Sequence, residues 1–203
     1  MLGLIKDNGK VLCICDSINV HTESNKLVDN NSYCWTPKGL KHTIILSEMG
    51  FYHNIFIRTM DNLFDPEYED EICKEYIMKE IVCRINGTFK KYGELKGYIE
   101  KTKFPLFIAT KDRIYQITNR CHVREIDEQN FYTGTPFIDA TLDEIKEEDL
   151  TKKILIALYI YHKYSYPICF PLVIKDTETL EATYYEYDDL ENAYKEYVSR
   201  KED

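Results

Sequence analysis

The side chains best suited to chemistry in this sequence are its seven cysteines. Cys13 and Cys15 point to the same face of a regular strand, since side chains on a strand repeat every second residue, and with Cys34 or His42 they could ligate a metal. No Cys-x-x-Cys or His-x-x-x-His pair accompanies them, so the pattern favours reduced thiols packed in a core and predicts no metal site. A buried thiol without a nearby base stays protonated, which also disfavours a cysteine nucleophile in mid-strand.

The five histidines are dispersed along the chain, so we expect surface or capping roles for them. His162, for example, lies near the end of a predicted helix, where a cation is favoured. Gly134-Thr135-Pro136 forms a turn before a predicted helix whose free amides could hold an anion, but any junction between a strand and a helix offers as much. The sequence therefore predicts no cofactor.

The chain has 203 residues, of which 44% are apolar and 30% charged, enough for one domain with a real core. It contains no apolar run of the roughly 18–20 residues that span a bilayer. Its first nine residues lack the basic end and the cleavage site of a signal peptide. We therefore expect a soluble, cytoplasmic protein that has no membrane partner.

Acidic residues are concentrated at the end of the chain. The net charge is −9, which argues against nucleic acid as a partner because phosphate binding needs a basic field. From Asp176 onward, ten acidic and three basic residues supply −7 of this charge. Within this tail, Tyr184 to Tyr197 is predicted to form an amphipathic edge strand and helix that pack their tyrosines. The alternative is a docking element for a basic partner.

Turn signals and apolar runs predict strands at the start of the chain. Leu2–Lys6 and Val11–Cys15 are typical of a hairpin around Asp7-Asn8-Gly9, because Asn-Gly tolerates positive φ. The second run is apolar at nearly every position, as expected of a strand covered on both faces. A further pair of strands is predicted at Ser32–Pro37 and Lys41–Ser47.

Helical and strand regions alternate along the rest of the chain. Apolar spacing predicts helices at Met49–Leu63 and Glu67–Ile85, with Asp65 as N-cap, before Gly87, Gly93 and Gly97 break the region. The order strands, helices, strands, helices, strands suggests two sheets between helical layers in one domain. The later strands are predicted at Pro105–Ala109, Arg113–Ile117, Val123–Ile126, Phe131–Thr133, Ile168–Ile174 and Leu180–Tyr187, and the later helices at Pro136–Glu147, Leu150–Tyr164 and Leu190–Val198.

Several patches, in this order, carry a resemblance to a known family. The chain resembles a β-type subunit of the proteasome family, particularly the bacterial proteasome-like peptidases among the N-terminal-nucleophile hydrolases. The resemblance implies an α+β fold, a four-layer αββα sandwich over residues 1–175, with residues 176–203 as an acidic C-terminal extension. The patches are the opening hairpin followed by Asp16, then Asn25-Lys26-Leu27, Phe107–Ile117 with Phe131-Tyr-Thr-Gly-Thr135, and Pro167–Ile174.

The resemblance also implies where an active site would lie. The family uses an N-terminal threonine, or in relatives serine or cysteine, whose own free amine acts as the base. A lysine, an aspartate and a serine support it. Asp16 matches the aspartate and Lys26 the lysine, whereas Thr135 replaces the serine of the Gly-Ser-Gly motif and Pro136 replaces its second glycine.

Other parts of the family's catalytic group are missing. No threonine precedes the first strand, which begins at Met1-Leu2, and methionine is poorly removed before leucine. The aspartate expected before Ile168 is absent, since Ser165-Tyr166-Pro167 stand there. No residue is therefore predicted with confidence to be catalytic, and Asp16, Lys26 and Thr135 are remnant candidates. Equally, Asp16 could cap a turn and Lys26 could be a solvated charge.

The sequence thus favours a non-catalytic protein on a proteasome-subunit scaffold. It would act by self-association or by binding another protein. The alternative is an amide hydrolase whose mature N-terminus differs from Met1. A third possibility is a ligand-sensing module that uses the space between the two sheets.

Overall fold

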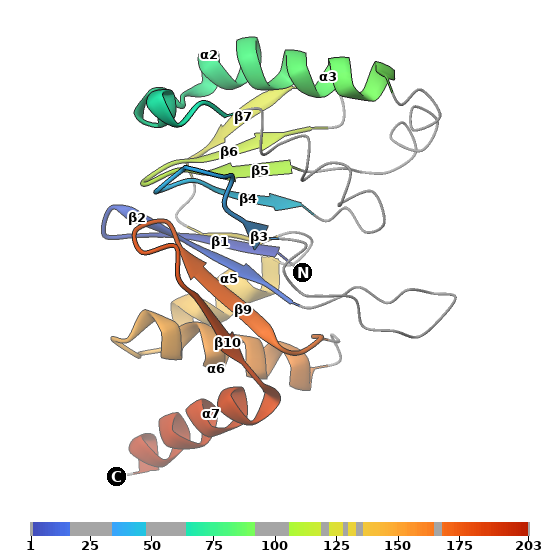
Figure 1. Ribbon diagram of the computed structural model, residues 1–203. Coiled ribbons are helices and arrows are strands. Elements are labelled where there is room, and N and C mark those ends of the chain that lie inside the picture. The colour runs from blue at the N-terminus through green and yellow to red at the C-terminus, as the bar shows by residue number, and fades with distance from the viewer. Residues whose placement is uncertain are drawn as a thin grey trace.

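The computed structural model describes residues 2–16, 34–47, 64–91, 106–118, 122–127, 130–132, 136–164 and 168–202. They form four stacked layers, in which one sheet is covered by helices on its outer face and packs on a second sheet, which is covered in turn by further helices (Figure 1). The predicted α+β, αββα sandwich is therefore confirmed. The first helical layer holds α2 (Lys74–Tyr76) and α3 (Val82–Lys91), the last holds α5 (Pro136–Glu144) and α6 (Leu150–Lys163), and α7 (Tyr187–Glu202) lies outside α6.

The sheet next to α5 and α6 joins segments from both ends of the chain. Its order is β10-β9-β2-β1-β8, and every neighbouring pair is antiparallel. Because β2 lies in the middle of the sheet between two layers, nearly all of its residues are buried, as predicted. The strands are β1 (Leu2–Asp7), β2 (Lys10–Cys15), β8 (Asn130–Tyr132), β9 (Leu172–Asp176) and β10 (Ala182–Tyr185).

The second sheet is an antiparallel series of strands in chain order, β3-β4-β5-β6-β7. At its edge, β3 ends at Trp35, two residues before the end of the predicted strand Ser32–Pro37, whose first two residues lie outside the described part of the chain. The strands are β3 (Cys34–Trp35), β4 (Ile44–Ser47), β5 (Leu106–Ala109), β6 (Ile114–Ile117) and β7 (Val123–Ile126).

Two turns need the backbone freedom of glycine or asparagine. Asn8 and Gly9 have φ of 45° and 81°, which lets the first hairpin reverse after two residues, as predicted. Gly39 has φ of 87°, and a Cβ there would lie 2.8 Å from Cγ of Pro66. Both the conformation and the close packing against Pro66 therefore favour glycine at this position.

The helical layer over the second sheet differs from the prediction of one helix at Glu67–Ile85. Asp65 does accept a hydrogen bond from the backbone of Glu67, but what it caps is a 3₁₀ turn, η2 (Pro66–Glu71). The helix proper begins at Lys74, includes a π-helical segment at Ile77–Ile81, and runs through Gly87 to Lys91. The prediction that Gly87 ends the helix was wrong, because packing outweighs the small cost of one glycine in a helix. The predicted helix at Met49–Leu63 lies outside the described residues.

The acidic tail packs onto α6. Helix α7 is longer than the predicted Leu190–Val198, and its apolar residues bury against α6. Tyr194 stacks on Tyr159 with ring centroids 4.8 Å apart. Two acids of α7 are ion-paired, Glu191 with Lys195 at 2.9 Å and Glu196 with Lys152 at 3.2 Å. These contacts agree with the prediction of an amphipathic element that packs its tyrosines.

Side chains of the two sheets contribute to three apolar clusters, with successive residues of a strand pointing to opposite faces. In β2, Leu12 and Ile14 face the helices α5 and α6, whereas Val11, Cys13 and Cys15 face the other sheet. The cluster between the sheets includes Phe107, which is fully buried. The residues of β2 therefore help to form both the outer core and the layer between the sheets.

Glu69 fastens the turn η2 to the loop before β4. Its carboxylate accepts hydrogen bonds from the backbone N–H of Lys41 at 2.7 Å and of His42 at 2.7 Å, and from the hydroxyl of Thr43 at 2.9 Å. Thr43 is fully buried, so its hydroxyl depends on this partner.

Replacing Glu69 with alanine is expected to lower the free energy of unfolding by about 2–3 kcal/mol, because a buried hydroxyl and two backbone donors lose a charged acceptor. Urea unfolding monitored by circular dichroism measures the change. Glu71→Ala, in the same turn but exposed, is the matched control and should change stability by at most about 0.5 kcal/mol. Equal losses in the two variants would contradict this role of Glu69.

Candidate functional site

The end of β2 brings together the head of β1 and a buried acid. Leu2 lies opposite Cys15 in the antiparallel pairing of β1 with β2. Asp16 follows directly and is only 4% exposed. Burial raises the pKa of Cys169, and the charge of Asp16 raises it further. The segment before β9, which holds Cys169, therefore also lies near this site. Of the three remnant candidates, the structure describes only Asp16, because Lys26 and Thr135 lie outside the described residues.

The thiols of this site are held in the neutral form. A hydrogen bond with Cys34, followed by burial, raises the pKa of Cys15 well above its usual value. A hydrogen bond with Cys13 and burial raise the pKa of Cys34 well above its usual value, although Cys15 and Lys175 act in the opposite direction. Cys13, Cys15 and Cys34 all belong to the apolar cluster between the sheets, as the prediction of core packing requires.

Lys175 is a residue of this site that the sequence analysis did not identify. It lies in β9 opposite Cys13, and its ammonium group donates a hydrogen bond of 2.8 Å to the hydroxyl of Thr36, just after β3. The contact therefore joins the two sheets. The only sequence signal is a lysine directly after the apolar run Leu172–Ile174, which is also typical of a strand that ends at the surface.

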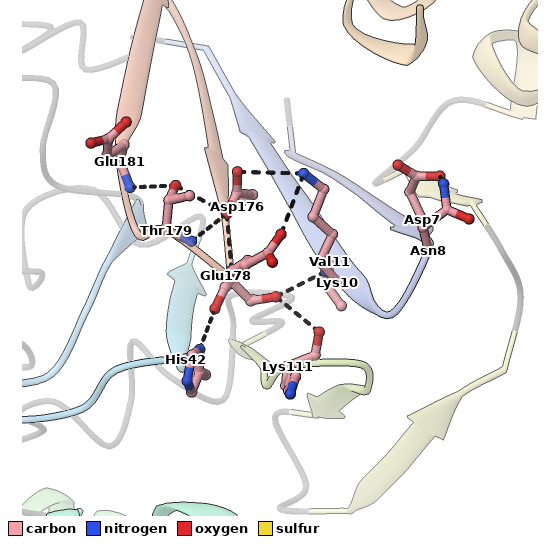
Figure 2. A network of polar contacts seen from close by, with 11 residues as sticks. Asp7, Asn8, Lys10, Val11, His42, Lys111, Asp176, Glu178, Thr179 and Glu181 are labelled. Atoms are coloured by element: carbon pink, nitrogen blue, oxygen red, sulfur yellow. Dashed lines mark hydrogen bonds and ion pairs between the residues drawn. The ribbon is translucent and has the colours of Figure 1, made fainter. Parts of the chain in front are cut away.

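Of the five histidines, the structure describes His42, His122 and His162, whereas His21 and His53 lie outside the described residues. His42 is at the opposite end of the sandwich, where its Nδ1 is 3.0 Å from the backbone oxygen of Thr177 (Figure 2). His162 accepts a hydrogen bond at Nδ1 from the backbone N–H of Ile168.

A second candidate site is a pocket of about 230 Å³ beside η2. Its polar wall holds Glu69, whose carboxylate is already occupied by the loop before β4. Lys111 and Arg113 together with Asp70 and Asp112 give its lining charges of both signs. Such a mixed lining selects no single class of ligand. Across the described residues, no group of three or more histidine, cysteine or acidic side chains is arranged to hold a metal.

No helix in the described part of the chain is both long and apolar enough to cross a membrane.

Comparison with known proteins identifies the architecture through structure alone. Neither family models nor curated proteins match the sequence. Among solved structures, the Anbu (ancestral beta-subunit) protein of Yersinia bercovieri has a TM-score of 0.67 at 12% identity, covering 98% of this chain and 93% of that one. The helical assembly of the Anbu complex of Pseudomonas aeruginosa has a TM-score of 0.66 at 8% identity, with coverages of 98% and 92%. The BPH protein of Thiobacillus denitrificans in complex with epoxomicin has a TM-score of 0.59 at 12% identity, with coverages of 88% and 98%. Similarity at these identities shows a shared fold.

Proposed function

We propose that this chain, which has the proteasome-type fold of the N-terminal-nucleophile hydrolases, is a non-catalytic protein that acts by assembling with copies of itself or with another protein. Its charge of −9 favours protein over nucleic acid as the partner. The proposal places it in the cytoplasm, the compartment in which most protein thiols are reduced.

The observation that carries the proposal is the composition of the head of β1. In this fold the reacting group belongs to the residue at that position, close to the aspartate that follows β2. Here Leu2 lies opposite Cys15, and Met1-Leu2-Gly3 contains no hydroxyl or thiol. The first serine, threonine or cysteine in the sequence is Cys13, in the middle of a buried strand.

The thiols near Asp16 support the same conclusion. A hydrogen bond with Cys34, followed by burial, raises the pKa of Cys15. A hydrogen bond with Cys13, together with burial, raises the pKa of Cys34, and burial raises that of Cys169. A neutral thiol is a poor nucleophile, because the thiolate is the reactive form. None of these three cysteines is therefore suited to replace a terminal threonine.

Self-association is supported by the fold neighbour described as a helical assembly. Sedimentation velocity of the full-length protein should give a species that is a multiple of 24.1 kDa. Asp16→Asn should leave the sedimentation profile unchanged, because the proposal assigns no catalytic role to this residue. A strictly monomeric protein that binds no other protein would contradict the proposal.

Fluorogenic peptides of varied sequence test the absence of hydrolysis. We expect release of fluorophore at the rate seen in buffer alone. A purified peptidase of known activity serves as the positive control for the assay. Turnover that disappears in Lys26→Ala and Asp16→Asn would instead support the alternative, an amide hydrolase whose mature N-terminus differs from Met1.

A further inference from the structure

Three cysteines from two different sheets meet in the layer between them. Cys13 and Cys15 are two residues apart in β2, so they face the same way, toward the other sheet. Cys34 comes from β3 of that other sheet and lies in the same apolar cluster. Cys34 shares hydrogen bonds with both Cys13 and Cys15. It is therefore in contact with each of two thiols across the sandwich.

Of these three thiols, Cys34 is also the one most easily brought to the solvent. It lies in β3, an edge strand whose described residues pair with β4 at two positions, Cys34 with Leu46 and Trp35 with Ile45. Short edge pairings open locally at low cost, well below the free energy of global unfolding. Its exposed fraction is 9%, compared with 0% for Cys13 and 1% for Cys15. An oxidant that reaches this layer therefore meets Cys34 first.

We propose that Cys34 is an oxidative modification site that forms a disulfide with Cys15 or Cys13 and so links the two sheets covalently. The co-reactant is a small disulfide such as oxidised glutathione. The Cys34 thiolate attacks one of its sulfurs and releases one glutathione thiol, which leaves a mixed disulfide on Cys34. The thiolate of Cys15 or Cys13 then attacks the Cys34 sulfur and releases the second glutathione thiol. Two protein thiols are oxidised, one glutathione disulfide is reduced, and the two protons end on the released thiols.

Because two cysteines of β2 lie near Cys34, the disulfide of Cys34 can form with either Cys13 or Cys15. Once Cys34 is bonded to one of the cysteines of β2, the other remains a free thiol on the same face. Its thiolate can attack Cys34 and displace the first partner by thiol–disulfide exchange. Lys175, hydrogen-bonded to Thr36, supplies a positive charge that favours the thiolate of Cys34. The raised pKa of Cys15 and of Cys34 makes the reaction slow rather than absent.

The test is oxidation of the folded, full-length protein with glutathione disulfide. Free thiols are then blocked by alkylation. Apart from the mass that alkylation adds, the intact protein should be about 2 Da lighter than the reduced protein, which indicates an intramolecular disulfide. Tryptic digestion without reduction should yield peptide 11–26, which holds Cys13 and Cys15, linked to peptide 27–38, which holds Cys34. Fragmentation then assigns the bond to Cys13 or Cys15, and either assignment supports the proposal.

Matched variants separate this site from the remaining thiols. Cys34→Ser should abolish the linked peptide pair, whereas Cys83→Ser, which removes an exposed cysteine of α3, should leave it unchanged. The wild-type peptide map decides the matter even if Cys34→Ser fails to fold. Folded protein that forms only mixed disulfides at exposed cysteines, or a bond within peptide 11–26, would overturn the proposal. Because no step depends on catalysis, the outcome is independent of the function proposed above.

Discussion

Replacing Phe107 with alanine is expected to lower the free energy of unfolding by about 3–5 kcal/mol. Phe107 lies in β5, has no exposed surface and belongs to the apolar cluster between the two sheets. Helices cover the outer faces of the sheets, so this layer has little freedom to collapse around a missing ring. The cost therefore combines the lost burial of the side chain with the cavity left behind. Urea unfolding with far-UV circular dichroism measures it.

Two further variants show that the effect comes from the volume of the ring between the sheets. Phe107→Leu should lose only about 1–1.5 kcal/mol, because most of the space stays filled. Phe137→Ala removes the same side chain from a position in α5 that is 44% exposed, and should cost no more than about 1 kcal/mol. If Phe107→Ala and Phe137→Ala were equally mild, the space between the sheets would not be the packed core described above.

Replacing Thr177 with valine is expected to lower the free energy of unfolding by about 2–4 kcal/mol. Thr177 directly follows β9 and has no exposed surface. Its hydroxyl accepts a hydrogen bond of 2.9 Å from the backbone N–H of Val11 and donates one of 3.0 Å to the backbone oxygen of Lys111. Valine keeps the shape but leaves the buried N–H of Val11 and the partly buried backbone oxygen of Lys111 without these partners.

The position of Thr177 explains why one hydroxyl has so large an effect. Figure 2 shows Val11 of β2, His42 before β4 and Lys111 after β5 converging on the turn that follows β9. The hydroxyl therefore ties the two sheets together at the end of the sandwich opposite Cys15. Thr177→Ser is the control, since it keeps both hydrogen bonds and should cost only about 1 kcal/mol for the lost methyl group. Equal losses for valine and serine would show that the methyl group, not the hydroxyl, matters.

The sequence predicted the architecture well where local signals and burial agree. Asn8-Gly9 set the first hairpin, and the uninterrupted apolar run at Val11–Cys15 identified a strand covered on both faces. The segment after Asp65 was harder, because a good N-cap and Pro66 indicate that a helix starts without saying whether it lasts. The chain makes only the 3₁₀ turn η2 there, in which Glu69 points back to the loop before β4. That contact spans residues distant in sequence, so local propensity does not show it.

The candidate site was predictable only in part, for a similar reason. Asp16 was found because it follows the first hairpin directly, and the structure describes it as buried beside Cys15. Lys175 was missed because its partners, Thr36 and Cys34, are about 140 residues away in sequence and meet it only after the sheets stack. A single lysine after an apolar run gives no indication of such a contact.

The measurement that tests the central claim most directly is the intact mass of the full-length protein after incubation with epoxomicin. This compound is the ligand named for the solved structure of the Thiobacillus denitrificans protein, which therefore provides the positive control. We expect that control to bind epoxomicin and this chain to keep its original mass, because Met1-Leu2-Gly3 contains no hydroxyl or thiol at the head of β1. A stoichiometric adduct on the terminal residue of this chain, lost in Lys26→Ala, would contradict the account and identify a working hydrolase.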